Sequence, residues 1–109
     1  MSNLLQNFLD DRPWRRVAYD HICKIPSGYL ATYGRIAELT HDDGYAISPR
    51  NVAWLRESLY QMLGHSSDVP LHRVAKKGDV DSIHDSDKTK AINDTLRHSE
   101  GFFANQLWL

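Results

Sequence analysis

The chain has 109 residues, 41% hydrophobic and 25% charged, so it can bury a core and does not have the composition of a disordered chain. Its 13 Lys and Arg against 14 Asp and Glu give a net charge of −1, which excludes a chain that is strongly basic throughout. The single cysteine, Cys23, excludes an intramolecular disulfide and a cysteine-rich metal cluster. The sequence shows neither a signal peptide nor an apolar run of the ~20 residues that span a membrane. We therefore expect one cytoplasmic domain over residues 1–109, with an N-terminal arm (1–13) and a C-terminal tail (102–109).

Apolar residues at helical spacing predict that the chain begins with two helices. A short stripe in residues 1–12 predicts a helix or docking arm, and a longer stripe runs from Trp14 to Ile25, before Pro26. On the longer helix, His21 lies on the apolar side and is interpreted as a hydrogen-bonded core or boundary side chain. Cys23 lies roughly opposite, as a partly exposed and inert thiol.

Two more helices follow, each with a capping residue. Thr32 can cap a helix over residues 33–40, and Ser48 with Pro49 can start a helix that runs to Leu63. The outward face of the second helix carries Arg50, Trp54, Glu57 and Gln61. Two helices joined by a short turn are typical of a helix-turn-helix, although most helical hairpins in small domains do not touch DNA.

The C-terminal third predicts a β-hairpin, a loop and a last helix. Residues 70–75 are expected to form a strand that turns at residues 76–79 and returns from Val80. Four aspartates around His84 are interpreted as a solvated loop rather than a metal site, because their spacing fits no EF-hand. Residues 102–109 form an apolar tail that is expected to pack back onto the domain, with a partner-binding tail as the alternative. We predict an α+β, mainly helical fold: a winged helix-turn-helix domain with a small β-hairpin wing.

Two segments together resemble a known family. Residues 25–37, IPSGYLATYGRIA, resemble the start of the DNA-binding domain of O6-alkylguanine-DNA alkyltransferases, and residues 70–74, PLHRV, resemble their active-site motif Pro-Cys-His-Arg-Val. Arg50 and Glu100 stand in the matching order, so that the resemblance covers roughly residues 14–101. Leu71 stands where these enzymes carry the cysteine that accepts the alkyl group, and leucine offers no nucleophile. The chain is thus more similar to the alkyltransferase-like proteins, which bind alkylated DNA without repairing it.

The resemblance implies roles for individual residues. Arg50 would enter the minor groove and replace a flipped nucleotide, Tyr33 would press on its phosphate, and Arg73 would order the neighbouring backbone. The DNA-binding residues implied are Thr32, Tyr33, Arg35, Arg50, Asn51, Trp54, Lys76 and Lys77. The pocket for the alkylated base would be lined by Pro70, Leu71, His72, Arg73, Val74 and Glu100. No catalytic residue, metal or cofactor is implied.

Some residues depart from the family pattern and keep an alternative open. Trp54 stands where the family has small residues, Glu57 would repel phosphates, and glycine is missing from residues 79–100. The leading hypothesis is a monomeric, non-enzymatic sensor of O6-alkylguanine in double-stranded DNA, which flags lesions for nucleotide-excision repair proteins. The alternative is a repurposed domain of the same fold that binds protein, or DNA without a lesion preference. Alkyl transfer to Cys23 is the least supported hypothesis.

Overall fold

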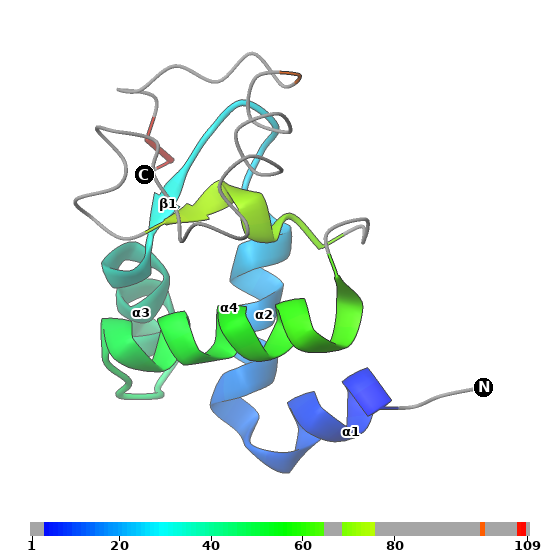
Figure 1. Cartoon of the computed structure of the whole chain (residues 1–109). Coiled ribbons are helices and arrows are strands. Elements are labelled where there is room, and N and C mark those ends of the chain that lie inside the picture. The colour runs from blue at the N-terminus through cyan, green and yellow to red at the C-terminus, as the bar shows by residue number, and fades with distance from the viewer. Residues whose placement is uncertain (1–3, 65–68, 76–98, 100–106, 109) are drawn as a thin grey trace.

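The computed structural model describes residues 4–64, 69–75, 99 and 107–108. Most of the described residues belong to four helices: α1 (Leu4–Asp11), α2 (Pro13–Cys23), α3 (Tyr33–Asp42) and α4 (Pro49–Leu63) (Figure 1). A short strand, β1 (Ala31–Thr32), precedes α3, and α4 is followed by a 3-10 turn, η1 (Leu71–Arg73), and a second short strand, β2 (Val74–Ala75). The mainly helical α+β fold with a helix-turn-helix is confirmed, α3 and α4 being its two helices.

Two capping residues determine where α3 and α4 begin. The Thr32 hydroxyl accepts a hydrogen bond from the Arg35 backbone N–H at 3.0 Å. At α4, the Ser48 hydroxyl accepts from the Asn51 backbone N–H at 3.3 Å, and the Asn51 side-chain oxygen accepts from the Ser48 backbone N–H at 2.9 Å. Each bond satisfies an N–H that the first helical turn leaves without a backbone partner. Both predicted helix starts are confirmed.

The core lies where α2, α3 and α4 meet. Each helix contributes apolar side chains that are fully or almost fully buried, and η1 and β2 add one residue each; examples are Ala18, Ile22, Ile36, Val52, Leu55, Leu59, Leu71 and Val74. At the edge of this core, His21 Nε2 lies 2.6 Å from the Asp43 carboxylate and links α2 to the end of α3. The interpretation of His21 as a hydrogen-bonded boundary side chain is confirmed.

The strand expected over residues 70–75 is only partly present. Leu71–Arg73 form a 3-10 turn, closed by hydrogen bonds from the Arg73 N–H to the Pro70 carbonyl and from the Val74 N–H to the Leu71 carbonyl. Only Val74 and Ala75 are extended, and β2 pairs in parallel with β1 rather than with a described hairpin partner. The expectation of a strand was therefore wrong at residues 70–73, because a local turn satisfies backbone groups there.

Other C-terminal predictions are tested only in part. Residues 107 and 108 return to the domain: the Trp108 N–H donates to the Leu30 carbonyl at 2.8 Å, and the Trp108 side chain packs against the core. The expected packing of the tail is confirmed for Trp108, whereas the Leu107 side chain is exposed. The returning strand of the wing, the aspartate-rich loop and most of the last helix lie outside the described residues. Among the described helices, none has the length and apolar character needed to cross a membrane.

Candidate nucleic-acid interface

The N-terminal turns of α3 and α4 bring several predicted DNA-binding residues together. A Cβ atom placed on Gly34 would lie 3.9 Å from Cγ of Pro49, so the first turns of the two helices are neighbours. Tyr33 is the first residue of α3, and Arg50 is the second residue of α4. Backbone N–H groups and the positive end of the helix dipole favour a phosphate at such a place.

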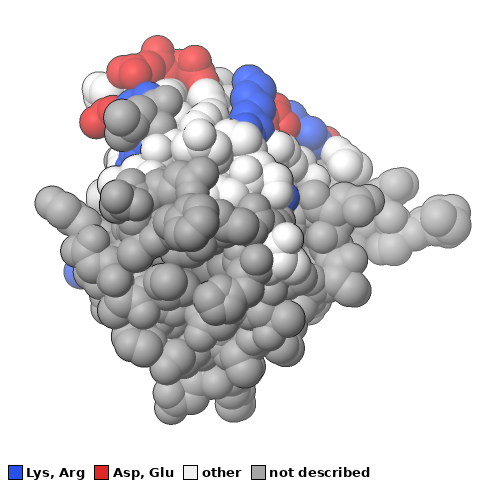
Figure 2. All heavy atoms as spheres, turned by 90° about the horizontal axis from the view of Figure 1, so that it is seen from above, with Lys and Arg blue, Asp and Glu red and all other residues white. Residues whose placement is uncertain are grey.

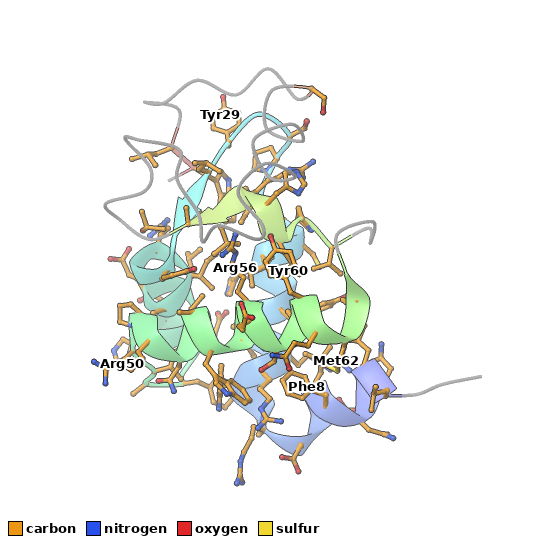
Figure 3. All side chains as sticks on the ribbon, in the orientation of Figure 1. Phe8, Tyr29, Arg50, Arg56, Tyr60 and Met62 are labelled. Atoms are coloured by element: carbon orange, nitrogen blue, oxygen red, sulfur yellow. The ribbon has the colours of Figure 1, made fainter. Side chains whose placement is uncertain are left out.

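The two arginines at these helix starts differ in availability. The Arg35 guanidinium forms an ion pair with Glu38 on the same helix, which offsets its charge. Arg50 is exposed, and no described residue forms an ion pair with it. Figure 3 shows Arg50 at the N-terminal end of α4, pointing outward. Seen from above, Figure 2 shows blue and red side chains next to one another among the described residues. Of the two arginines, Arg50 is therefore the one better placed to reach DNA.

Trp54 lies one turn along α4 from Arg50, but its contacts lie with the first two helices. Its ring centroid is 5.7 Å from that of Phe8 on α1 and 6.2 Å from that of Trp14 on α2. The Arg15 guanidinium carbon lies 5.0 Å from the Trp54 ring centroid and 4.4 Å from that of Phe8. Trp54 remains 47% exposed. One side of its indole thus completes an aromatic cluster with α1, and the other side faces solvent.

The predicted base-pocket residues 70–74 are held firmly against the domain. Leu71 is 2% exposed and belongs to the hydrophobic core, and Pro70 and Val74 are buried as well. Arg73 donates from its guanidinium to the Ile25 carbonyl at 2.8 Å and so fixes backbone that follows α2. His72 is half-buried. Lys76, Lys77 and Glu100 lie outside the described residues.

Arg56 is a residue of this region that the sequence analysis missed. It is 7% exposed, and it donates to the Leu71 carbonyl at 3.1 Å, the Tyr33 hydroxyl at 3.2 Å and the Tyr60 hydroxyl at 3.2 Å. It lies four residues after Val52, so it falls on the same buried stripe of α4. A charged residue on an apolar helical stripe is the signal that could have identified it, because arginine is seldom buried without partners.

Cys23 lies at the C-terminal end of α2 and is exposed, as expected. Partial burial of its thiol raises the pKa above the ordinary value, a hydrogen bond with Tyr19 lowers it in part, and the nearby Asp20 carboxylate raises it further. Burial, followed by the proximity of Cys23, raises the pKa of Tyr19 to about 12. The thiolate is the nucleophilic form, and these surroundings disfavour it. Among the described residues, no group of three or more His, Cys, Asp or Glu side chains forms a metal site.

Comparison with known proteins identifies the family. Residues 13–101 match the family model described as 6-O-methylguanine DNA methyltransferase, DNA binding domain. The chain belongs to this family. Helix α1 precedes the matched range, and both segments that carry the sequence resemblance lie inside it. The resemblance stated from those segments is confirmed.

One solved structure is similar to this chain in fold and in sequence. The crystal structure of S. pombe Atl1 in complex with damaged DNA containing O6-carboxymethylguanine superimposes with a TM-score of 0.63 and 27% sequence identity. The match covers 82% of this chain and 76% of the Atl1 chain. Among curated proteins, no match was found.

Proposed function

We propose that this domain binds double-stranded DNA that contains an O6-alkylated guanine and does not remove the alkyl group. The observation that carries this proposal is Leu71. It occupies the second position of the Pro-Leu-His-Arg-Val motif in a chain of the methyltransferase DNA-binding family, and it is buried in the core. Nucleophilic transfer needs an activated thiolate or an equivalent group, which leucine lacks. The likeness to Atl1, whose solved complex contains O6-carboxymethylguanine DNA, supports damaged DNA as the ligand.

In this proposal the helix-turn-helix enters the minor groove at the start of α4. Arg50 inserts into the base stack, where its long cationic side chain replaces the flipped nucleotide in a region of negative potential. Tyr33, on the neighbouring first turn of α3, contacts the phosphate of that nucleotide. The base lies against residues 70–74, where the buried Leu71 stands in place of the thiol. Lys76 and Lys77 contact phosphates, and His72 and Glu100 support the pocket.

The proposed role downstream of binding is to mark the lesion. A protein that extrudes an alkylated base without repairing it leaves a distorted duplex with a protein bound to it. Nucleotide-excision repair proteins are the class of partner that recognises such a site, and the domain acts as a monomer beside the DNA, in a nucleoid or a nucleus. Thr32, Arg35 and Asn51 flank the contacts at the helix starts, and capping bonds already hold Thr32 and Asn51 in place.

The test is fluorescence anisotropy with two duplexes that differ only in one O6-methylguanine. We expect the Kd for the damaged duplex to be lower by at least about tenfold, which corresponds to about 1.4 kcal/mol. Arg50→Ala should weaken binding to the damaged duplex by about tenfold or more. The matched control is Arg12→Ala, which removes an exposed arginine between α1 and α2. Equal and negligible affinity of the wild-type protein for both duplexes at low salt would refute the proposal.

A second candidate function is a protein-interaction module or a lesion-independent DNA-binding module of the same fold. The half-exposed indole of Trp54, with the exposed Glu57 on the same outward face of α4, is the observation that favours it. The anisotropy experiment separates the two candidates. Tight but equal binding of both duplexes would favour the lesion-independent module.

A further inference from the structure

Arg56 is the point at which three segments of the proposed site meet. It extends from α4 and donates hydrogen bonds to the Leu71 carbonyl in η1 and to the Tyr33 hydroxyl at the start of α3. A third donor reaches the Tyr60 hydroxyl one turn along α4, and the Arg56 guanidinium carbon lies 4.9 Å from the centroid of the Tyr60 ring. Figure 3 shows Arg56 and Tyr60 on the side of α4 that faces η1. One planar guanidinium therefore fixes three partners at once.

The bond to Leu71 holds the wall of the proposed pocket. Within η1 the Leu71 carbonyl also accepts from the Val74 N–H, which closes the 3-10 turn. Because the carbonyl and the side chain belong to the same residue, a displacement of the Leu71 carbonyl would also shift the Leu71 side chain. Arg56 thus restricts the position of the side chain that stands in place of the family's thiol.

The bond to Tyr33 affects a group that lies on the proposed DNA side. A tyrosine hydroxyl that accepts a hydrogen bond can still donate its own proton. Because its donor here is a cation with little exposure to water, the hydroxyl is polarised and becomes a stronger donor toward a phosphate oxygen. The positive charge of Arg56 would in this way strengthen the hydrogen bond between Tyr33 and the DNA phosphate.

We propose that Arg56 is a positioning residue that couples the phosphate contact of Tyr33 to the pocket wall at Leu71, and that this coupling sets the preference for damaged over undamaged DNA. The inference rests on the function proposed above. It predicts that the coupling acts only when a base enters the pocket, since only then are both partners of Arg56 engaged. Loss of Arg56 should therefore weaken binding to damaged DNA more than binding to undamaged DNA.

The experiment measures the ratio of the two Kd values, undamaged over damaged, for a set of full-length variants. Arg56→Met keeps the length of the side chain and removes all donors, and Arg56→Lys keeps the charge but loses the planar fork. Tyr33→Phe removes only the hydroxyl that accepts from Arg56. Its matched control is Tyr60→Phe, which removes a hydroxyl bonded to the same guanidinium but located on α4 itself. A variant that folds only in part would bind both duplexes more weakly by the same factor, which would leave the ratio of the two Kd values unchanged.

We expect Arg56→Met, Arg56→Lys and Tyr33→Phe each to lower the ratio by about tenfold, the effect of one hydrogen bond to a charged group. Tyr60→Phe should stay within about twofold of wild type. In the Arg56→Met background, Tyr33→Phe should have little further effect, because the two residues act through one interaction. Should Arg56→Met not fold, the same cycle is measured with Arg56→Lys.

Three results would overturn the inference. The first is a wild-type ratio in both Arg56 variants, and the second is full additivity of Arg56→Met and Tyr33→Phe. Either result would leave the proposed function standing, because the wild-type protein would still distinguish the duplexes. The third is a ratio near one for the wild-type protein, which would contradict both the inference and the proposed function.

Discussion

At the scale of single residues, the environment of Cys23 determines how the lone thiol reacts. Burial and Asp20 raise its pKa, and the neutral thiol is therefore the form that folding favours. We expect the rate of carboxamidomethylation in the folded protein to rise with pH at a higher midpoint than in the urea-unfolded protein. The matched variant Tyr19→Phe removes the hydrogen bond that lowers this pKa, so its midpoint should lie higher still. A midpoint in the folded protein below that of the unfolded protein would contradict this assignment.

The same pKa shift gives a pH dependence of stability with a defined sign. The folded-state pKa of Cys23 lies above the unfolded-state pKa, so the unfolded protein loses the thiol proton first as the pH rises. The contribution of this group to the free energy of unfolding is fully present below the unfolded-state pKa and is lost as the pH rises through the folded-state pKa. Urea unfolding of wild type and Cys23→Ser above neutral pH measures it: the free energy should fall more steeply with pH in the wild type.

At the scale of elements, α1 is tied to the family domain by Arg15 and by an aromatic contact. Arg15 donates to the Phe8 carbonyl at 3.0 Å, forms an ion pair with Asp11 and covers the Phe8 ring, which contacts Trp54 on α4. Phe8→Ala should lower the free energy of unfolding by about 2 kcal/mol, because a half-buried ring is removed. The matched control in the same helix is Leu4→Ala, which removes a side chain that is 59% exposed and should change it by less than about 0.5 kcal/mol. Urea unfolding measures both, and equal effects would show that α1 is not docked through Phe8.

These elements also show what sequence can predict. The starts of α3 and α4 followed from Thr32 and Ser48, because a capping bond joins residues three apart and is visible in the local pattern. Family membership followed from two short segments. The 3-10 turn at η1, the contact of Trp54 with Phe8 and the bonds of Arg56 were not predicted, because each depends on tertiary packing. Arg56 bonds to Leu71 and Tyr33, which lie 15 and 23 residues away in the sequence, and the apolar stripe of α4 alone does not predict these partners.

At the scale of the whole molecule, a net charge of −1 requires that DNA be held by local charge. The cations proposed to enter or contact the DNA are few, chiefly Arg50 in the minor groove and Lys76 and Lys77 at phosphates. Since each neutralised phosphate contributes about −0.9 to the slope of log K against log salt, we expect a slope of about −3 for the damaged duplex. Arg50→Ala should reduce its magnitude by about 1. Anisotropy titrations over a range of salt concentrations provide the slope, and a slope near zero would exclude phosphate contacts as the basis of binding.

The central claim is that the domain holds an O6-alkylguanine and leaves it unchanged. The most direct measurement is to isolate the complex with an O6-methylguanine duplex by gel filtration and to determine the intact mass of the bound protein. We predict that the protein co-elutes with the damaged duplex, in preference to the matched undamaged duplex, and that its mass equals that of the untreated chain. A protein heavier by one alkyl group, or a protein that elutes free of the damaged duplex, would contradict the account.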